Sequence, residues 1–229
     1  MDLFDECKEM TIKEYRKLKT QNGCRFLYSS PESLKMKNGI CFLGDSPKLN
    51  DGKKENLDLR KLDNDYNAFI DEYWDDNEER IYNDLQKRVQ KLFRLLNSEL
   101  GFANGYEKLM RNTLTSNLVF IRAEGSSDVK KEWRQFSKQV WRKVFSEHAP
   151  QIVILNGDGK ENWTSLCEIF EEQIESTEKL PVNSTGYIKF IDSEPFLLGV
   201  PHLSKLFMDF EDQKHLNKSK RVFQIISDK

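Results

Sequence analysis

The sequence predicts an α/β protein of three layers, in which helices cover both faces of a central, mostly parallel sheet of four strands. Short apolar runs without polar alternation recur along the chain, a pattern typical of strands that are buried on both faces. Amphipathic segments separate these runs in the strand, turn, helix order of a doubly wound sheet. The 229 residues, 38% of them hydrophobic, suffice for one core, so we expect a single domain over residues 1–229.

The first 38 residues are expected to form a structural extension of this domain. Residues 11–19 predict a short helix capped by Thr11, and Asn22-Gly23 ends it before the apolar pair Phe26 and Leu27. The N-terminus has no basic stretch followed by an apolar one, and no window is long enough to span a membrane. We therefore expect a soluble, cytoplasmic protein with no membrane partner.

The cysteines indicate free thiols rather than a metal site. The chain contains four, at positions 7, 24, 41 and 167, and none of them forms a CxxC pair. Cys41 lies in a predicted buried strand, which suits a thiol in a reducing compartment. We expect no metal and no other cofactor.

The first strand and the loop after it, residues 39–52, are the centre of the predicted site. Residues 40–43 form an apolar run typical of a buried strand. Gly44 permits a sharp turn, and Pro47 stiffens it. Asp45 is thereby expected at the carboxyl end of the strand, where open α/β sheets bind their ligands.

The segment 65–100 predicts a long amphipathic helix inserted between the first two sheet strands. Its apolar residues recur at three- and four-residue steps, and Gly101 ends it. Such a helix is longer than a domain of this size usually holds, so we expect a kink or break near Asp76-Asn77. The aromatic stripe is most simply core packing, with a substrate-covering role as the alternative.

Charge is unevenly distributed along the chain, although the net charge is only −2. Residues 58–79 hold nine acidic and two basic residues, a net charge of −7, and predict an acidic face that a protein partner can use. Residues 80–149 hold fourteen basic and seven acidic residues, a net charge of +7. A basic face suits a phosphate backbone, but most charge runs are only solvated helix faces.

Further strands and helices follow in alternation. Residues 114–120 predict a second core strand with a polar break at Asn117, which either serves a function or caps a turn. The remaining elements are a helix from Asp128, a strand at 151–155, a helix at 162–174, and strands at 187–191 and 196–200.

The tetrapeptide Pro201-His202-Leu203-Ser204 repeats the pattern of the first loop, because it places a proline and a polar side chain directly after an apolar strand. An isolated histidine is most often an ordinary hydrogen-bonded one. His202 becomes a candidate site residue because Asp45 and Asn117 also follow predicted neighbouring strands.

These segments resemble the motifs of the uracil-DNA glycosylase superfamily. The similarity covers FLGDSP at 42–47, TSNLVFIR at 115–122, PQIVILNG at 150–157 and PHLS at 201–204, in the family's order. The resemblance implies that Asp45 is the catalytic carboxylate and that His202 holds the departing base. It further implies that Asn117 recognises an extruded base, with Ser46, Pro47 and Lys48 beside the substrate. In the last loop it implies DNA contacts by Ser204 and Lys205, and by Leu203 or Leu206 as a wedge into the emptied stack.

The implied function is that of a monofunctional DNA glycosylase, a hydrolase that flips a base out of DNA, hydrolyses its N-glycosidic bond and leaves an abasic site. Ser46 stands where other family members carry their catalytic Asp or Asn, and Lys48 where some carry a Tyr that excludes bulky bases. We therefore expect a damaged or bulky modified base, such as phage DNA carries, rather than plain uracil. Base excision in DNA repair or in anti-phage defence, by a monomer, is the expected role.

Two alternatives come from other classes. LGDSPKLNDG at 43–52 also resembles the first block of GDSL esterases, in which Ser46 is the nucleophile and His202 its base. That pattern requires an Asp three residues before the histidine, and this position is Gly199. The second alternative is a glycosylase fold without catalysis that only binds DNA or protein.

Overall fold

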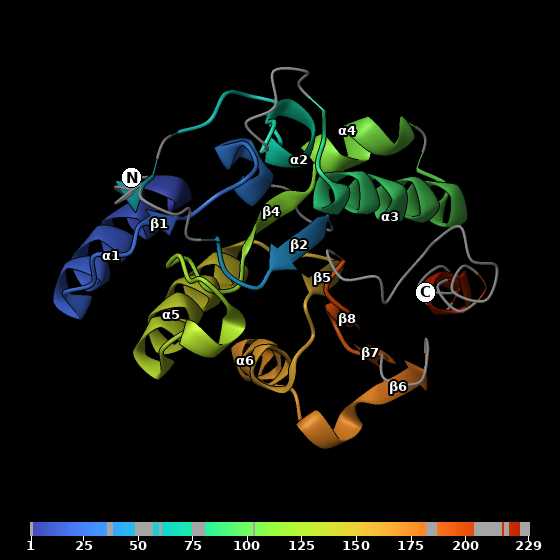
Figure 1. Ribbon diagram of the computed structural model, residues 1–229. Coiled ribbons are helices and arrows are strands. Elements are labelled where there is room, and N and C mark those ends of the chain that lie inside the picture. Colours follow the sequence, from blue (N-terminus) through green and yellow to red (C-terminus); the bar gives the residue numbers. More distant parts are fainter. Residues whose placement is uncertain are drawn as a thin grey trace.

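The protein is a layered α/β structure with one central sheet (Figure 1), in a computed structural model that describes residues 2–35, 39–48, 57–59, 61–74, 81–102, 104–181, 187–203, 217 and 220–224. The sheet has six strands, in the order β4-β2-β5-β8-β7-β6. Their bounds are β2 Ile40–Gly44, β4 Leu114–Asn117, β5 Ile152–Asn156, β6 Glu178–Pro181, β7 Tyr187–Ile191 and β8 Phe196–Val200. The four strands β4, β2, β5 and β8 are parallel, whereas β7 and β6 extend the sheet antiparallel beyond the four strands expected.

The register of the parallel strands aligns their carboxyl ends at one edge. Gly44, the last residue of β2, is paired with Asn117, the last residue of β4. On the other side, Asn156 at the end of β5 is paired with Val200 at the end of β8. Every residue of these four strands is buried, and β2, β8 and most of β5 are accordingly apolar, whereas β4 is buried although three of its four residues are polar. The loops that follow the strands therefore meet.

Helices cover both faces of the sheet (Figure 1). The helices are α1 Leu3–Leu18, α2 Ala68–Asp71, α3 Asp84–Leu100, α4 Gly105–Arg111, α5 Lys131–Glu147 and α6 Lys160–Phe170, with short 3-10 turns at Pro31–Lys35, Ser126–Asp128 and Ile174–Ser176. Alternate side chains of β2 enter different cores: Cys41 and Leu43 pack with α1, α5 and α6, whereas Ile40 and Phe42 pack with α3 and α4. A separate two-stranded sheet joins β1 Cys24–Arg25 to β3 Leu57–Asp58.

The N-terminal helix is longer than the sequence predicts. It begins at Leu3, because the Asp2 side chain accepts a hydrogen bond from the Asp5 N–H and caps it. Thr11, expected as the cap, lies buried inside the helix, where its hydroxyl donates to the Cys7 carbonyl at 2.7 Å. A threonine hydroxyl that bonds back to the preceding turn needs no helix end.

The segment 65–100 forms two helices, α2 and α3, rather than one continuous helix, so the interruption expected within it occurs. α2 ends at Asp71, and Asn83 begins α3 with a capping box in which its side chain and that of Gln86 bond each other's backbone N–H. Residues 72–74 and 81–83 are not helical. The expected break at Asp76-Asn77 falls between these two stretches but outside the described residues. The second strand also ends earlier than predicted, at Asn117, and the helix expected to reach residue 174 ends at Phe170.

The four cysteines are buried free thiols, and burial raises the pKa of Cys41 well above its usual value. Within the described ranges, no group of three or more His, Cys, Asp and Glu side chains is arranged to hold a metal ion. Among the helices that the structure describes, none is both long enough and apolar enough to cross a membrane.

His148 makes the stability of the fold sensitive to acid. It is 2% exposed after the end of α5, and burial lowers its pKa from 6.5 to about 4. At pH values between these two pKa values, His148 is therefore protonated in the unfolded chain but not in the folded chain. We expect the free energy of unfolding to be at its full value above pH 6.5 and to fall by about 3 kcal/mol as the pH drops to 4.

Urea denaturation at pH 7.5 and at pH 4.5 measures this effect. His148→Phe, which has no titrating group, is expected to lose less stability between the two pH values than the wild type does. Equal losses in the two proteins would assign the acid sensitivity to other groups.

Candidate active site

A large cavity opens at the edge of the sheet where the four parallel strands end. Its volume is about 1990 Å³, and β2, β4 and β5 contribute to its wall together with the loop after β8. The residues that line it at the strand ends are Gly44, Asp45, Asn117, Asn156, Gly157, Pro201 and His202. The structure therefore brings together the three motif residues that the sequence singled out, Asp45, Asn117 and His202.

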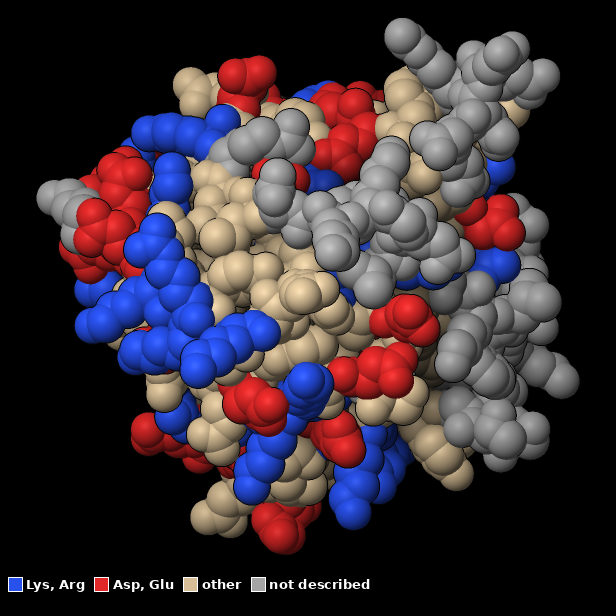
Figure 2. All heavy atoms as spheres, turned by 60° about the vertical axis from the view of Figure 1, so that its left-hand side comes forward, with Lys and Arg blue, Asp and Glu red and all other residues tan. Residues whose placement is uncertain are grey.

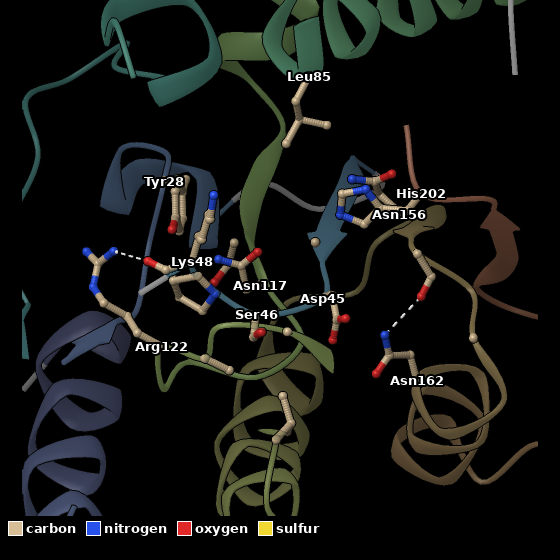
Figure 3. A pocket seen from close by; sticks show the side chains of 18 of the residues that line it. Tyr28, Asp45, Ser46, Lys48, Leu85, Asn117, Arg122, Asn156, Asn162 and His202 are labelled. Atoms are coloured by element: carbon tan, nitrogen blue, oxygen red, sulfur yellow. Dashed lines mark hydrogen bonds between the residues drawn. The ribbon is translucent and has the colours of Figure 1, made fainter. Parts of the chain in front are cut away.

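Asp45 and His202 both lie beside Gly157. A Cβ added at Gly157 would be 3.1 Å from the His202 ring and 3.7 Å from the Asp45 Cβ, and its φ of +98° suits glycine. Figure 3 shows the two side chains on the same side of the sheet edge. The loop that carries His202 is held firmly, because the Asn156 side-chain oxygen accepts a hydrogen bond from the Leu203 N–H at 2.8 Å.

The Asp45 carboxylate has an oxygen without a hydrogen-bond partner. Its Oδ1 is buried and makes no hydrogen bond with the described residues. Leaving a buried carboxylate oxygen unpaired costs free energy, and such groups in native proteins usually serve a site or bind water. Asp45 itself lines the cavity, where a carboxylate can accept a hydrogen bond from water or stabilise a developing positive charge.

Asn117 is packed against the first loop by a contact that only glycine allows. A Cβ at Gly44 would overlap the Asn117 side-chain oxygen, so the two strand ends approach each other closely. The backbone of the next residues is tied in as well, since Leu118 N–H donates to the Gly44 carbonyl at 2.8 Å and Val119 N–H to the Asp45 carbonyl at 2.9 Å. Asn117 therefore presents a fixed amide at the cavity wall.

The rest of the first loop lies along the same cavity. Ser46, Pro47 and Lys48 all line it. Ala123 N–H donates to the Pro47 carbonyl at 2.9 Å, and Arg122 Nη1 donates to the Lys48 carbonyl at 3.1 Å, as drawn in Figure 3. The loop is thus fixed by the segment that follows β4.

The last motif differs from the prediction. Leu203, expected as a wedge into DNA, is 0% exposed and belongs to the core beside α3, so its side chain is not available to a ligand. Its backbone is fixed, because its carbonyl accepts from Arg88 Nη1 at 2.7 Å. Ser204, Lys205 and Leu206, the other expected DNA contacts, lie outside the described residues.

Several cavity residues were not predicted. Tyr28 comes from the N-terminal segment, and its ring contacts Phe69 and Trp74 at centroid distances of 6.5 and 6.2 Å. Asp158 pairs with Lys189 at 3.1 Å, and both line the cavity. No sequence pattern marked them, since they lie beside the predicted motifs only in three dimensions. Tyr73, Trp74 and Tyr82, by contrast, belong to the inserted segment that was expected as a possible cover for the substrate, and all three line the cavity.

Many of the charges counted in the sequence are used within the molecule. In the acidic segment, Asp65 pairs with Lys108, Asp71 with Arg111, and Glu72 with Arg25. The basic residues of α5 pair in the same way, in Arg134–Glu161, Lys138–Glu168 and Lys143–Glu6. Figure 2 shows one face with an uncharged centre and with Lys and Arg gathered along one flank. Three exposed lysines on separate elements line the cavity: Lys48, Lys87 and Lys160.

No protein-family model matches the chain, and no curated protein matches it at a significant level.

Proposed function

We propose that the protein is a DNA glycosylase that hydrolyses the N-glycosidic bond of a damaged or bulky modified base. One observation carries this proposal: the loops after the parallel strands bring Asp45, Asn117 and His202 to one cavity, with an unpaired carboxylate oxygen on Asp45. The motif resemblance assigned roles to the same three residues. Their convergence from separate parts of the chain supports those roles.

The chemistry requires opposite charges to be stabilised at the two ends of one bond. As the bond between the sugar C1′ and the base nitrogen breaks, positive charge develops on the sugar and negative charge on the base. The Asp45 carboxylate stabilises the sugar and orients the water whose oxygen bonds to C1′. An N–H of the His202 ring donates to the departing base. Both residues lie close to the position that a Cβ of Gly157 would take, and this proximity suits groups that act on one substrate.

Recognition of the base would fall to Asn117, whose amide offers a donor and an acceptor in one plane. The exposed lysines Lys48, Lys87 and Lys160 come to the cavity from three separate segments and suit the phosphates of a DNA strand. The cavity volume of about 1990 Å³ exceeds the roughly 300–1,000 Å³ of typical ligand pockets, so the cleft has room for a flipped base together with part of its DNA strand.

The esterase alternative meets a steric obstacle. It needs an acidic residue at position 199, three before His202. A Cβ at Gly199 would lie 2.8 Å from the Trp163 ring and 2.9 Å from the Asp158 Cβ, so this position within β8 has no room for any side chain. The glycosylase proposal needs no side chain there.

The test is an excision assay with the purified protein. Oligonucleotides carry uracil, common damaged bases or phage-type modified cytosines, in single and double strands. Alkali cleaves any abasic product, and mass spectrometry identifies the released base. We expect release of a bulky modified base and weak release of uracil. Efficient release of uracil would reject the bulky-base preference. No abasic product from any strand would reject the glycosylase, and hydrolysis of a nitrophenyl ester that Ser46→Ala abolishes would favour the esterase.

Gly44→Ala is expected to lower the excision rate about a hundredfold, because displacing a substrate-positioning group by about 1 Å has costs of this order. The new Cβ would overlap the Asn117 side-chain oxygen and push the amide out of place. The matched control is Gly159→Ala in the same cavity wall, where a Cβ meets nothing within 4 Å. Initial rates on the preferred substrate compare the two variants, and similar losses in both would argue against a special role for the Gly44 contact.

A further inference from the structure

We infer that the rim of the cavity binds unpaired DNA bases that flank the excised one, by stacking them on the rings of Tyr73 and Tyr187. The choice of DNA as the ligand rests on the proposed glycosylase function. The binding of a strand by these rings needs no catalysis, so it can be tested without it. The inference names the substrate class of the site, which is a DNA strand whose bases are not paired.

Exposed apolar side chains gather at this cavity. Among the described residues, four large apolar side chains are strongly exposed: Tyr73, Ile81, Ile174 and Tyr187. Three of the four, all except Ile174, line the cavity. Single apolar residues scattered over a protein surface are normal, whereas a group of them at one place marks a binding surface. The rim of the cavity therefore has apolar surface that a ligand can cover.

The ring of Tyr73 is supported as a flat platform. It stacks on the ring of Tyr82, with the centroids 5.2 Å apart and the planes 15° from parallel. The Tyr82 hydroxyl donates a hydrogen bond to the Ile70 carbonyl of α2 at 2.5 Å, which fixes the supporting ring. Tyr73 is nevertheless 45% exposed, so much of its ring stays open to a ligand. An aromatic ring held in this way suits the stacking of a base.

Tyr73 belongs to a segment that is anchored on β4. The ring of its chain neighbour Trp74 packs on the ring of Tyr28 at a centroid distance of 6.2 Å. Tyr28 is tied to β4, because its N–H donates to the Thr115 carbonyl of that strand at 2.9 Å. β4 is the edge strand of the sheet and ends in Asn117. The first platform therefore reaches the cavity at one end of the strand order.

Tyr187 reaches the cavity from the other part of the sheet. It begins β7, and because β7 is antiparallel to β8, it lies at the edge where β8 ends. Figure 3 shows Asn117, Asp45 and His202 in this order across the cavity, in agreement with the strand order β4-β2-β5-β8-β7. Neighbouring strands lie about 4.8 Å apart, so β4 and β7 are about 19 Å from each other, a distance that several nucleotides span. A strand that passes from one tyrosine to the other therefore crosses the candidate catalytic residues.

The charges in the cavity wall suit the backbone of such a strand. Three exposed lysines from separate segments line the cavity: Lys48, Lys87 and Lys160. Acidic side chains line it as well, and three of them are neutralised by ion pairs within the molecule, in Glu72–Arg25, Asp158–Lys189 and Glu161–Arg134. Aromatic rings for the bases and cations for the phosphates in one groove are the features by which proteins bind single strands.

Rings at the rim favour a single strand over a duplex. In a duplex each base is covered on both faces by its neighbours in the stack, so a side chain at the surface meets only backbone and base edges. In an unpaired strand the faces of the bases are free to stack on an aromatic ring, and every base has such a face. The platforms at Tyr73 and Tyr187 therefore add to the binding of unpaired DNA and add nothing to the binding of a duplex.

Fluorescence anisotropy of three labelled probes of equal length tests the inference. The probes are single-stranded oligothymidine, a strand with the same backbone but abasic sites in place of the bases, and oligothymidine paired with its complement. We expect the wild type to bind oligothymidine at least tenfold more tightly than either other probe. Equal affinity for oligothymidine and the abasic strand, or for oligothymidine and the duplex, would overturn the inference.

Variants assign the preference to the two rings. Tyr73→Ala and Tyr187→Ala are each expected to weaken the binding of oligothymidine about tenfold and to leave the abasic strand unchanged, whereas the phenylalanine variants of both keep the wild-type affinity. Lys87→Met, which removes a phosphate contact, is expected to weaken both single strands equally. Ile174→Ala, at an equally exposed residue outside the cavity, is the matched control and should change neither. Alanine variants that bind oligothymidine as the wild type does would overturn the role of the rings.

The outcome is independent of the excision assay. A wild type that prefers oligothymidine through these rings but excises no base would reject the proposed function and keep the stacking site. A wild type that excises a base but binds the abasic strand as tightly as oligothymidine would keep the proposed function and overturn the stacking site.

Discussion

Replacing Asp45 with asparagine is expected to lower the excision rate about a thousandfold, or about 4 kcal/mol of transition-state stabilisation. Asparagine has nearly the same shape but no charge, so it cannot stabilise a cationic sugar. The buried Oδ1 makes no hydrogen bond with the described residues. The substitution therefore breaks none there, and the fold should tolerate it. Single-turnover rates on the preferred oligonucleotide measure the effect.

The matched control is Asp158→Asn, the other carboxylate beside Gly157 in the cavity wall. The Asp158 carboxylate already forms an ion pair with Lys189 at 3.1 Å, whereas no such partner holds Oδ1 of Asp45 among the described residues. We expect its rate to stay within about tenfold of the wild type, since it takes no part in the proposed transition state. A wild-type rate in Asp45→Asn, or equal losses in both variants, would remove Asp45 from the catalytic role.

Replacing Arg25 with methionine is expected to lower the free energy of unfolding by about 3 kcal/mol. Arg25 is buried, and its guanidinium neutralises the Glu72 carboxylate through two hydrogen bonds. After the change, Glu72 keeps only the Tyr66 hydroxyl and Trp74 Nε1 as partners and remains partly buried with an uncompensated charge. Urea denaturation at pH 7.5 gives the free energy.

Two controls separate charge from packing. The double variant Arg25→Met/Glu72→Gln removes both charges and is expected to recover part of the loss, since no carboxylate is then left unpaired. Lys35→Met removes a cation from the exposed pair with Glu32, whose side chains are 57% and 48% exposed, and is expected to change stability little. A double variant as unstable as the single one would show that lost packing dominates.

The sequence predicted the elements whose signal is local. Four predicted strands and one predicted helix occur in the structure: the strands at 40–43, 151–155, 187–191 and 196–200, and the basic helix α5. Their apolar runs and periodic faces can be recognised without any distant contact. β6 was missed, since Glu178–Pro181 is mostly exposed and carries no apolar pattern. It forms only because β7 pairs with it at the edge of the sheet.

The candidate site was predicted in part, for a related reason. Asp45, Asn117 and His202 follow strands, and strands of a parallel sheet end at one edge. Tyr28 could not be found this way, because it reaches the cavity from a distant part of the chain and its own segment shows no periodicity. Leu203 was wrongly placed because the pattern after β8 does not reveal whether a side chain turns toward the cavity or into the core.

The position of β8 has a consequence for how the chain folds during synthesis. β8 is the last of the parallel strands in sequence, yet it lies between β5 and β7. Until it emerges from the ribosome, the newly made β5 offers an open, apolar edge to other nascent chains. The non-local pairing of β5 with β8 makes this closure slow compared with helix formation. His202 comes just after β8. The pairing of β8 with β5 therefore covers the aggregation-prone edge and completes the cavity in one step.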